Sequence, residues 1–198
     1  MYSIHTTPGF IIESRPRGEA GRVFSVFTRD LGLILASAQG IRFEKSKLRY
    51  HTREYSLGIY SFVRGREYWR LTSAQEFNDE GRSKKEGGKM QGTLLLARLA
   101  LLLRRLLHGE EPHPELFAHI AACAEFLAQA PIDNDRLTTL ESLVVFRMFH
   151  SLGYIGKDPE TDPYVADSTI TLALLDAAAE KRPALNRHIN KALKESHL

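Results

Sequence analysis

Two β-strands and the turn that joins them are recognisable in the segment Arg22-Val-Phe-Ser-Val-Phe-Thr-Arg-Asp-Leu-Gly-Leu-Ile-Leu-Ala-Ser-Ala38. Valine, isoleucine and phenylalanine favour extended backbone, and they are frequent on both sides of the turn. The middle of the segment, Arg29-Asp-Leu-Gly32, has the polar residues and the glycine of a hairpin turn. We therefore expect a β-hairpin here.

Three further segments that flank the hairpin are typical of strands: Phe10–Ser14, Tyr55–Val63 and Tyr68–Thr72. Apolar residues two positions apart, such as Leu57 and Ile59, give the later strands one half-buried face. Five short strands in the first part of the chain suit a small closed or partly open barrel, because closure removes sheet edges.

The connection between the third and fourth strands, Gly40–Arg53, is rich in cations and in aromatic rings. Extended backbone advances by about 3.3 Å per residue, so these cations can follow several phosphates of a nucleic acid. The rings of Phe43 and Tyr50 can stack on unpaired bases. A solvated basic loop would have the same composition. The cations of this connection are Arg42, Lys45, Lys47, Arg49 and Arg53.

Charge is distributed unevenly along the chain. Residues 1–77 hold 12 lysines and arginines against 7 acidic residues, whereas residues 78–198 hold 15 against 17. This asymmetry suggests that the N-terminal part binds a polyanion, although random drift in composition can produce a difference of this size.

The composition changes after the last strand. Residues 78–89 are dense in glycine and charge and contain no large apolar residue, which is typical of a linker. Beyond them, apolar residues recur with the 3.6-residue period of helices. We expect an α+β protein with a β-barrel domain in residues 1–78, a linker in residues 79–90 and an α-helical domain in residues 91–198. The expected helices span residues 91–108, 114–130, 135–152, 167–181 and 184–196.

Cysteine content and hydropathy indicate a cytoplasmic protein. Cys123 is the single cysteine, which fits a reducing compartment and excludes a disulfide framework. The first residues show no secretory signal. The most apolar segment, Thr93–His108, contains arginines, and its uncharged run is far shorter than the roughly 20 residues that span a bilayer. A buried helix explains it better than a helix lying on a membrane surface.

The sequence contains no recognisable catalytic or metal-binding motif. Asp158, Glu160 and Asp162 have the spacing of calcium ligands, but prolines interrupt them and the required glycine is missing. No histidine forms a ligand pattern with the cysteine or with an acid four residues away. Asp133 and Asp135 are typical of helix caps. We expect no enzyme, no cofactor and no metal ion.

A series of segments then suggests a family. The first part of the chain contains, in order, Arg15-Pro-Arg-Gly-Glu19, Phe24-Ser-Val-Phe-Thr-Arg-Asp-Leu-Gly32 and Ala38-Gln-Gly-Ile-Arg-Phe-Glu-Lys-Ser-Lys-Leu-Arg49. Trp69-Arg-Leu-Thr-Ser73 follows, and the helical part contains Leu140–Tyr154, which ends in Leu-Gly-Tyr. In order and spacing, these segments resemble the RecO family of recombination mediators.

The resemblance implies an OB-fold barrel followed by an α-helical domain. Proteins of this family bind single- and double-stranded DNA, anneal complementary strands and engage the acidic C-terminal tail of single-strand DNA-binding protein. With RecR they help to load RecA in recombinational repair. The chain departs from the family in two respects. It is shorter than usual, and Gly156–Val165 lacks the cysteines of the zinc module that many members carry.

The resemblance and the basic connection together predict a binding site rather than a catalytic one. Cations directed at the nucleic-acid backbone leave the base edges free, as annealing requires. Phe43 and Tyr50 are candidates for base stacking, although Phe43 is more simply explained as a core ring. Gly18, Gly32 and Gly40 are expected in turns, and Tyr55 and Trp69 in the core. The predicted DNA-binding residues are Arg42, Lys45, Lys47 and Arg49, extended by Arg15, Arg17 and Arg22.

The helix expected at 91–108 offers a site for the tail of single-strand DNA-binding protein. Leu102 and neighbouring leucines could form an apolar groove, with Arg98 or Arg105 pairing the tail's carboxylate. The same leucines are equally well explained as helical core. Two other functions also fit the sequence: an RNA-binding OB-fold barrel, and a protein–protein adaptor that uses the basic loop and the helical groove.

Overall fold

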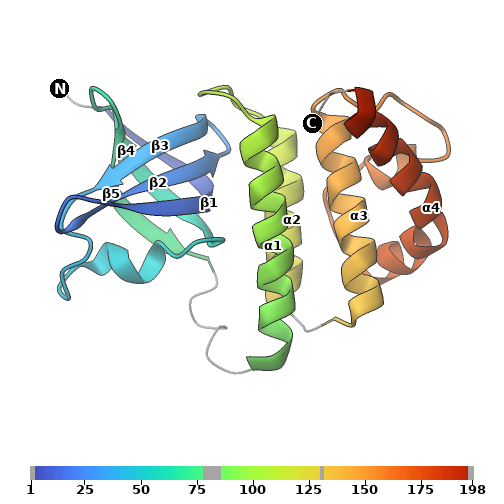
Figure 1. The fold of residues 1–198 in the computed structure, drawn as a ribbon, viewed down its shortest axis with the longest axis horizontal. Coiled ribbons are helices and arrows are strands. Elements are labelled where there is room, and N and C mark those ends of the chain that lie inside the picture. The colour runs from blue at the N-terminus through green and yellow to red at the C-terminus, as the bar shows by residue number, and fades with distance from the viewer. Residues whose placement is uncertain (1–2, 78–85, 130–131, 196–198) are drawn as a thin grey trace. The chain divides into compact units, whose positions relative to one another are not determined.

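The computed structural model describes residues 3–77, 86–129 and 132–195. The first of these ranges forms a β-barrel, and the other two form helices and their connections (Figure 1). The strands are β1 (Ile4–Arg17), β2 (Gly21–Thr28), β3 (Gly32–Ala38), β4 (Leu57–Val63) and β5 (Trp69–Glu76).

The barrel closes because β1 is long enough to pair with two neighbours. Its first part, from Ile4 to Phe10, pairs antiparallel with β4, and its second part, from Gly9 to Arg17, pairs antiparallel with β2. On the other side, β3 pairs with β2 and, in parallel, with β5. The resulting order, β1-β2-β3-β5-β4, is that of a closed OB-fold barrel, as the sequence predicted.

The start of β1 was predicted too late. The strand begins at Ile4 rather than at Phe10, because its first residues are mostly polar and carry no apolar signal. Their backbone groups nevertheless pair with β4, which satisfies them. The side chains that point inwards from the five strands form a continuous hydrophobic core. This core includes Ile11, Phe24, Val26, Ile34, Tyr60, Phe62, Trp69 and Leu71.

The chain forms two compact units, and the barrel unit includes residues 96–114 from beyond the last strand. Gly32 shows how closely this segment approaches the barrel. Its φ is +70°, and a Cβ there would lie 2.3 Å from the carbonyl oxygen of Glu111. The backbone of Leu33 also donates a hydrogen bond of 3.2 Å to the carbonyl oxygen of Gly109. Gly32 is therefore required both by its turn and by its neighbour.

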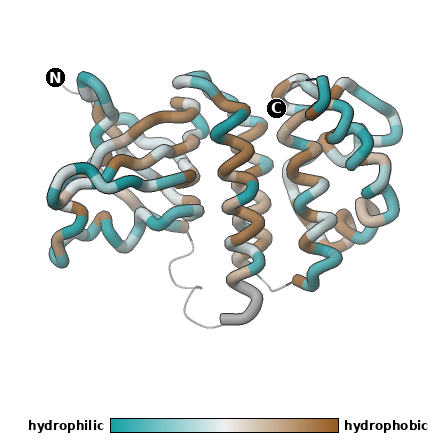
Figure 2. The backbone as a smooth tube through the Cα atoms, viewed as in Figure 1, coloured by the Kyte–Doolittle hydropathy of each residue, from teal (hydrophilic) through white to brown (hydrophobic). Residues whose placement is uncertain are grey.

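The helices are α1 (Glu86–Leu106), α2 (Pro114–Gln129), α3 (Asn134–Ser151) and α4 (Leu172–Glu195). Figure 2 shows α1 as mainly hydrophobic, with hydrophilic bands. Residues 79–85 of the expected linker lie outside the described residues, and residues 86–90 belong to α1. Asp133 caps α3 as expected, because its side chain accepts a hydrogen bond from the backbone of Arg136. Asp135 lies in the first turn and pairs with Arg182 instead.

The expectation of two helices at 167–181 and 184–196 was wrong. A single helix, α4, runs through Pro183, and residues 167–171 precede it as a loop. Proline removes one hydrogen bond of the helix ladder, but Pro183 is exposed to solvent. Buried side chains such as Ala178 and Leu185 lie on both sides of it and keep one apolar face continuous. Packing of this face overrides the local preference of proline.

The second unit is built around a buried cation. Arg147 of α3 is almost fully buried, and its guanidinium donates to the carbonyl oxygens of Tyr164 at 2.6 Å and Ser168 at 2.9 Å. These acceptors belong to the connection between α3 and α4. Burial lowers the pKa of Arg147 to about 10, which still leaves it charged at neutral pH. Its role is therefore structural, because it satisfies the carbonyl groups of a connection that has little regular structure.

Candidate nucleic-acid interface

The connection between β3 and β4 is fixed to the barrel rather than loose. Its short 3-10 helix, Lys47–His51, lies between Ile41 and Thr52, which are both buried. The backbone of Arg42 donates a hydrogen bond of 3.2 Å to the carbonyl oxygen of Ala20. Farther along, the backbone of Tyr55 donates one of 2.7 Å to Ile11. These anchors hold the connection against the start of β2 and the middle of β1.

A cleft of about 580 Å³ lies between this connection and the strands β1 and β2. We call it the first cleft. Cations outnumber acids in its lining by four to one, which gives it a positive potential. The lining residues are Ser14, Arg22, Ile41, Arg42, Arg49, Thr52, Arg53 and Glu54.

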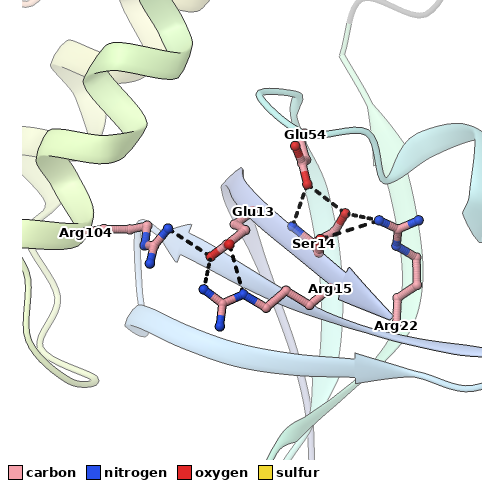
Figure 3. Close-up of polar contacts among 6 residues, drawn as sticks. All are labelled: Glu13, Ser14, Arg15, Arg22, Glu54 and Arg104. Atoms are coloured by element: carbon pink, nitrogen blue, oxygen red, sulfur yellow. Dashed lines mark hydrogen bonds and ion pairs between the residues drawn. The ribbon is translucent and has the colours of Figure 1, made fainter. Parts of the chain in front are cut away.

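A short hydrogen-bonded chain orders one wall of the first cleft. The Oγ of Ser14 donates to Glu54 Oε1 at 2.9 Å and accepts a hydrogen bond of 2.6 Å from Arg22 Nη2. The backbone nitrogen of Ser14 also donates to Glu54 Oε1, at 2.8 Å (Figure 3). Glu54 is therefore partly satisfied by Ser14, and the guanidinium of Arg22 is held in place without a direct ion pair.

The structure divides the predicted DNA-binding residues into three groups. Arg22, Arg42 and Arg49 meet in the first cleft, together with Arg53, which had been counted among the cations but not among the site residues. Lys45 and Lys47 are exposed on the same connection but do not line the cleft. Arg15 and Arg17 line a different cleft, described below.

Both aromatic rings of the connection face solvent. Phe43 is 65% exposed and Tyr50 is 54% exposed, so the simpler reading of Phe43 as a core ring was wrong. Trp69, by contrast, is 6% exposed and belongs to the barrel core, as expected, whereas Tyr55 is only half-buried and lies outside that core. Both rings belong to the connection that lines the cationic cleft, and both are accessible to solvent.

A second cleft, of about 440 Å³, shares no residue with the first. Glu13 is central to it. Its carboxylate accepts hydrogen bonds from Arg15, 2.9 Å to Nε, and forms an ion pair of 3.1 Å with Arg104 of α1 (Figure 3). This carboxylate also raises the pKa of Arg15. The lining residues are Glu13, Arg15, Pro16, Arg17, Val23, Ser25, Leu35, Tyr68 and Arg104.

Sequence reasoning missed several cations of the barrel unit. The turn between β4 and β5 was assigned as a turn only, yet its Arg64 and Arg66 line a hollow of about 390 Å³ together with Arg70 of β5. Arg104 was placed in a helix with no link to the barrel, although it pairs with Glu13. The excess of positive charge in residues 1–77 was the available signal for Arg64, Arg66 and Arg70. The spacing of residues along the sequence did not indicate that Arg104 pairs with a residue of the barrel.

Most of the leucines that were expected to line a groove on α1 are buried in the protein. Leu99, Leu103 and Leu106 are buried, as the alternative of a helical core predicted. Leu102 is half-buried, and its neighbours Arg98, Leu101 and Arg105 are exposed, as are Leu94 and Arg104 of the same helix. Leu101 and part of Leu102 therefore form a narrow exposed apolar strip, and Arg98 and Arg105 lie near it on the helix.

The helical unit contains one histidine pattern that sequence reasoning overlooked. On α2, Glu115, His119 and Cys123 follow one another at four-residue intervals. His119 Nε2 lies 3.9 Å from Glu115 Oε1. Burial lowers the pKa of His119 to about 4 and raises the pKa of Cys123 to about 12, so both are neutral at pH 7. A buried neutral thiol is a packing residue rather than a metal ligand.

Two features are absent from the described part of the chain. No group of three or more histidine, cysteine, aspartate or glutamate side chains within it is arranged to hold a metal ion. Nor does any helix there combine the length and the apolar character that crossing a membrane requires.

Comparison with known proteins identifies the barrel region. The family model described as "Recombination protein O N terminal" matches residues 1–77. A DNA repair protein RecO from Nitrosospira multiformis is 33% identical over 74% of this chain and 57% of its own length. RecO proteins from Gloeothece citriformis and a Cyanothece species are 27% and 26% identical, each over 81% of this chain. The chain spans about half the length of these relatives. With residues 1–77 matched by the family model and most of the chain similar to these relatives, the barrel of this chain belongs to the RecO family.

Proposed function

We propose that this chain is a non-catalytic, DNA-binding recombination mediator. It binds single- and double-stranded DNA, promotes annealing of complementary strands and helps to load a recombinase on DNA coated by single-strand DNA-binding protein. The observation that carries the proposal is the convergence of four arginines, Arg22, Arg42, Arg49 and Arg53, on one cleft of an OB-fold barrel.

The first cleft suits a single strand because it combines two kinds of contact. Its guanidinium groups neutralise phosphates and release counterions, which supplies affinity without reading the base sequence. The exposed rings of Phe43 and Tyr50 lie on the same connection and can stack on bases at about 1–3 kcal/mol each. Contacts of this kind leave the base edges free, so that a complementary strand can pair with a bound one.

Two protein partners belong to the proposal because of family membership. The first is the acidic tail of single-strand DNA-binding protein, which would lie along the exposed strip of α1. Arg98, Leu102 and Arg105 are spaced by four and three residues, so they share one helix face, and exposed Leu101 lies beside them. The second partner is RecR.

The test of the DNA site is a salt titration of the full chain with a fluorescent oligothymidylate. With four phosphate contacts on a single strand, the slope of log affinity against log salt concentration is expected to be about −3. Changing Arg42, Arg49 and Arg53 to alanine should make the slope clearly shallower, because three of the four phosphate contacts of the first cleft are lost. Arg29→Ala removes one exposed charge of the same barrel that does not line the first cleft, and its slope should stay close to the wild-type value.

An unchanged slope in the triple variant would overturn the first cleft as the DNA site. The same titration with an oligouridylate of equal length addresses the RNA alternative. Tighter binding of RNA than of DNA at matched salt would favour an RNA-binding barrel over the proposed mediator.

A further inference from the structure

Three residues of β1, from Glu13 to Arg15, alternate between the two clefts. Ser14 lines the first cleft, whereas its neighbours Glu13 and Arg15 line the second. Side chains of successive strand residues point to opposite faces, so β1 separates the two clefts. Figure 3 shows Glu13 and Arg15 grouped with Arg104, and Ser14 grouped with Arg22 and Glu54. β2 repeats the division, because Arg22 lines the first cleft and Val23 the second.

The second cleft lies where OB-fold barrels commonly hold oligonucleotides. That place is the outer face of the second and third strands, bordered by the β1–β2 and β4–β5 connections. Here Val23 and Ser25 come from β2 and Leu35 from β3. Arg17 ends β1, and Tyr68 precedes β5. The first cleft is bordered instead by the β3–β4 connection, so the two are separate surfaces of one barrel.

The second cleft has the chemistry of a single-strand site. Three guanidinium groups, from Arg15, Arg17 and Arg104, line it together with one carboxylate, from Glu13, and Arg17 also pairs with exposed Glu67 at 3.3 Å. The guanidinium carbon of Arg17 lies 4.3 Å from the centre of the Tyr68 ring, which orients the ring. Leu35 is 50% exposed and offers an apolar surface beside it. Cations for phosphates, together with an aromatic and an aliphatic surface for bases, match what single-strand binding requires.

Glu13 binds two of these arginines in the way that a phosphate could. Its two carboxylate oxygens accept hydrogen bonds from Nε and Nη2 of Arg15, at 2.9 Å and 3.2 Å, and one of them also pairs with Arg104. Arginine binds phosphate with the same two-pronged geometry. The carboxylate therefore holds two of the three arginines in place and competes with any anion that enters.

We propose that the second cleft binds a second single strand of nucleic acid while the first cleft holds another, so that one chain carries two strands at once. This inference rests on the proposed function, because it gives the first cleft the first strand. Glu13 acts as an internal competitor that weakens binding in the second cleft and lets the second strand leave. Two strands held on either side of β1, with their charge neutralised, would be brought together for annealing.

The experiment is native mass spectrometry of the full chain with two oligothymidylates of about ten nucleotides that differ in length. Thymidylates do not pair with each other, so any complex that contains both must be assembled by the protein. The expected species has one strand of each length per protein chain. The Arg15→Ala, Arg17→Ala double variant should form only complexes with one strand, whereas Arg29→Ala should still form the two-strand complex.

Each outcome separates this inference from the proposal on which it rests. Absence of any complex would refute the proposed function itself. One strand per wild-type chain, or two strands retained by the double variant, would overturn the second cleft while leaving the first intact. Glu13→Gln should strengthen binding of the second strand by about two- to fivefold, as expected for loss of one exposed ion-pair partner. Glu19→Gln, an exposed acid that lines neither cleft, should not strengthen it.

Discussion

The indole nitrogen of Trp69 donates a hydrogen bond of 3.0 Å to Glu110 Oε1, although the two residues lie 41 positions apart. The other oxygen of the same carboxylate pairs with Arg64, whose guanidinium lies 4.8 Å from the centre of the Trp69 ring. Trp69 is the first residue of β5, and Glu110 follows α1. The barrel is therefore completed by a segment that comes after it in the chain.

Removal of this carboxylate should destabilise the barrel unit. Glu110→Ala leaves the buried indole nitrogen without its acceptor, which is expected to cost about 1–2 kcal/mol. Glu110→Gln keeps an acceptor and should lose less. Because Trp69 is the single tryptophan, its fluorescence during urea unfolding reports on this unit directly. Equal stability of the alanine variant and the wild type would show that the hydrogen bond contributes nothing.

Two glycines provide a matched test of the turn before β3. Gly18 and Gly32 have similar positive φ values, 61° and 70°, so alanine at either should cost about 1 kcal/mol from backbone strain. A Cβ at Gly18 meets nothing within 4 Å, whereas one at Gly32 collides with the backbone of Glu111. Gly32→Ala should therefore lose about 3 kcal/mol or more in denaturant unfolding. Similar losses in the two variants would contradict the close approach of Glu111.

Acid should destabilise the helical unit through His119. This side chain is 2% exposed, and neither ring nitrogen has a hydrogen-bond partner among the described residues. Its pKa is lowered from 6.5 to about 4, mainly by burial and next by Arg147. Between these values the unfolded chain binds the extra proton, so the free energy of unfolding falls as the pH falls. The loss in the free energy of unfolding should approach about 3 kcal/mol as the pH nears the lowered pKa of His119.

Circular dichroism during urea unfolding, at about pH 7 and at about pH 4.5, measures this loss. His119→Leu should remove most of the difference between the two stabilities, because leucine does not titrate. His108→Leu, which changes an exposed histidine, is the matched control and should keep the difference. A difference that persists in His119→Leu would assign the acid sensitivity to other groups.

The exposed rings should contribute affinity without changing the salt dependence. Replacing Phe43 or Tyr50 with alanine removes stacking of about 1–3 kcal/mol per base, so affinity for oligothymidylate should fall about tenfold. The slope against salt should stay the same, because no phosphate contact is lost. Ile4→Ala, which truncates another exposed apolar residue of the barrel, should bind normally. Normal binding by both ring variants would exclude stacking at this site.

The positions of the strands along the chain were largely predictable because they follow local rules, whereas their order in the sheet was not predicted. The β-branched and aromatic residues of Arg22–Thr28 and Leu57–Val63 favour strands, and Gly18, Gly32 and Gly40 occupy turns with positive φ, as expected. The first residues of β1 and the continuity of α4 through Pro183 were missed. Both depend on contacts distant in sequence, namely the ladder with β4 and the buried face of α4.

The division of the basic residues was less accessible to sequence reasoning. Arg15 and Arg22 are close in sequence and were treated as parts of one path, yet they face different clefts. A bulge between Ile11 and Glu13 shifts the register of β1, so counting residues does not reveal which side chain faces which side. Arg104 joins the second cleft only through the fold of the segment after the barrel.

The connection Gly40–Arg53 is proposed to lie against bound single-stranded DNA. The most direct measurement is photo-crosslinking of the full chain to an oligothymidylate that carries iodouracil, with the attached peptides identified by mass spectrometry. The proposed function predicts crosslinks within Gly40–Arg53, at Phe43 and Tyr50 in particular, because these rings are exposed beside the first cleft. A bound complex whose crosslinks all lie outside Gly40–Arg53 would contradict it.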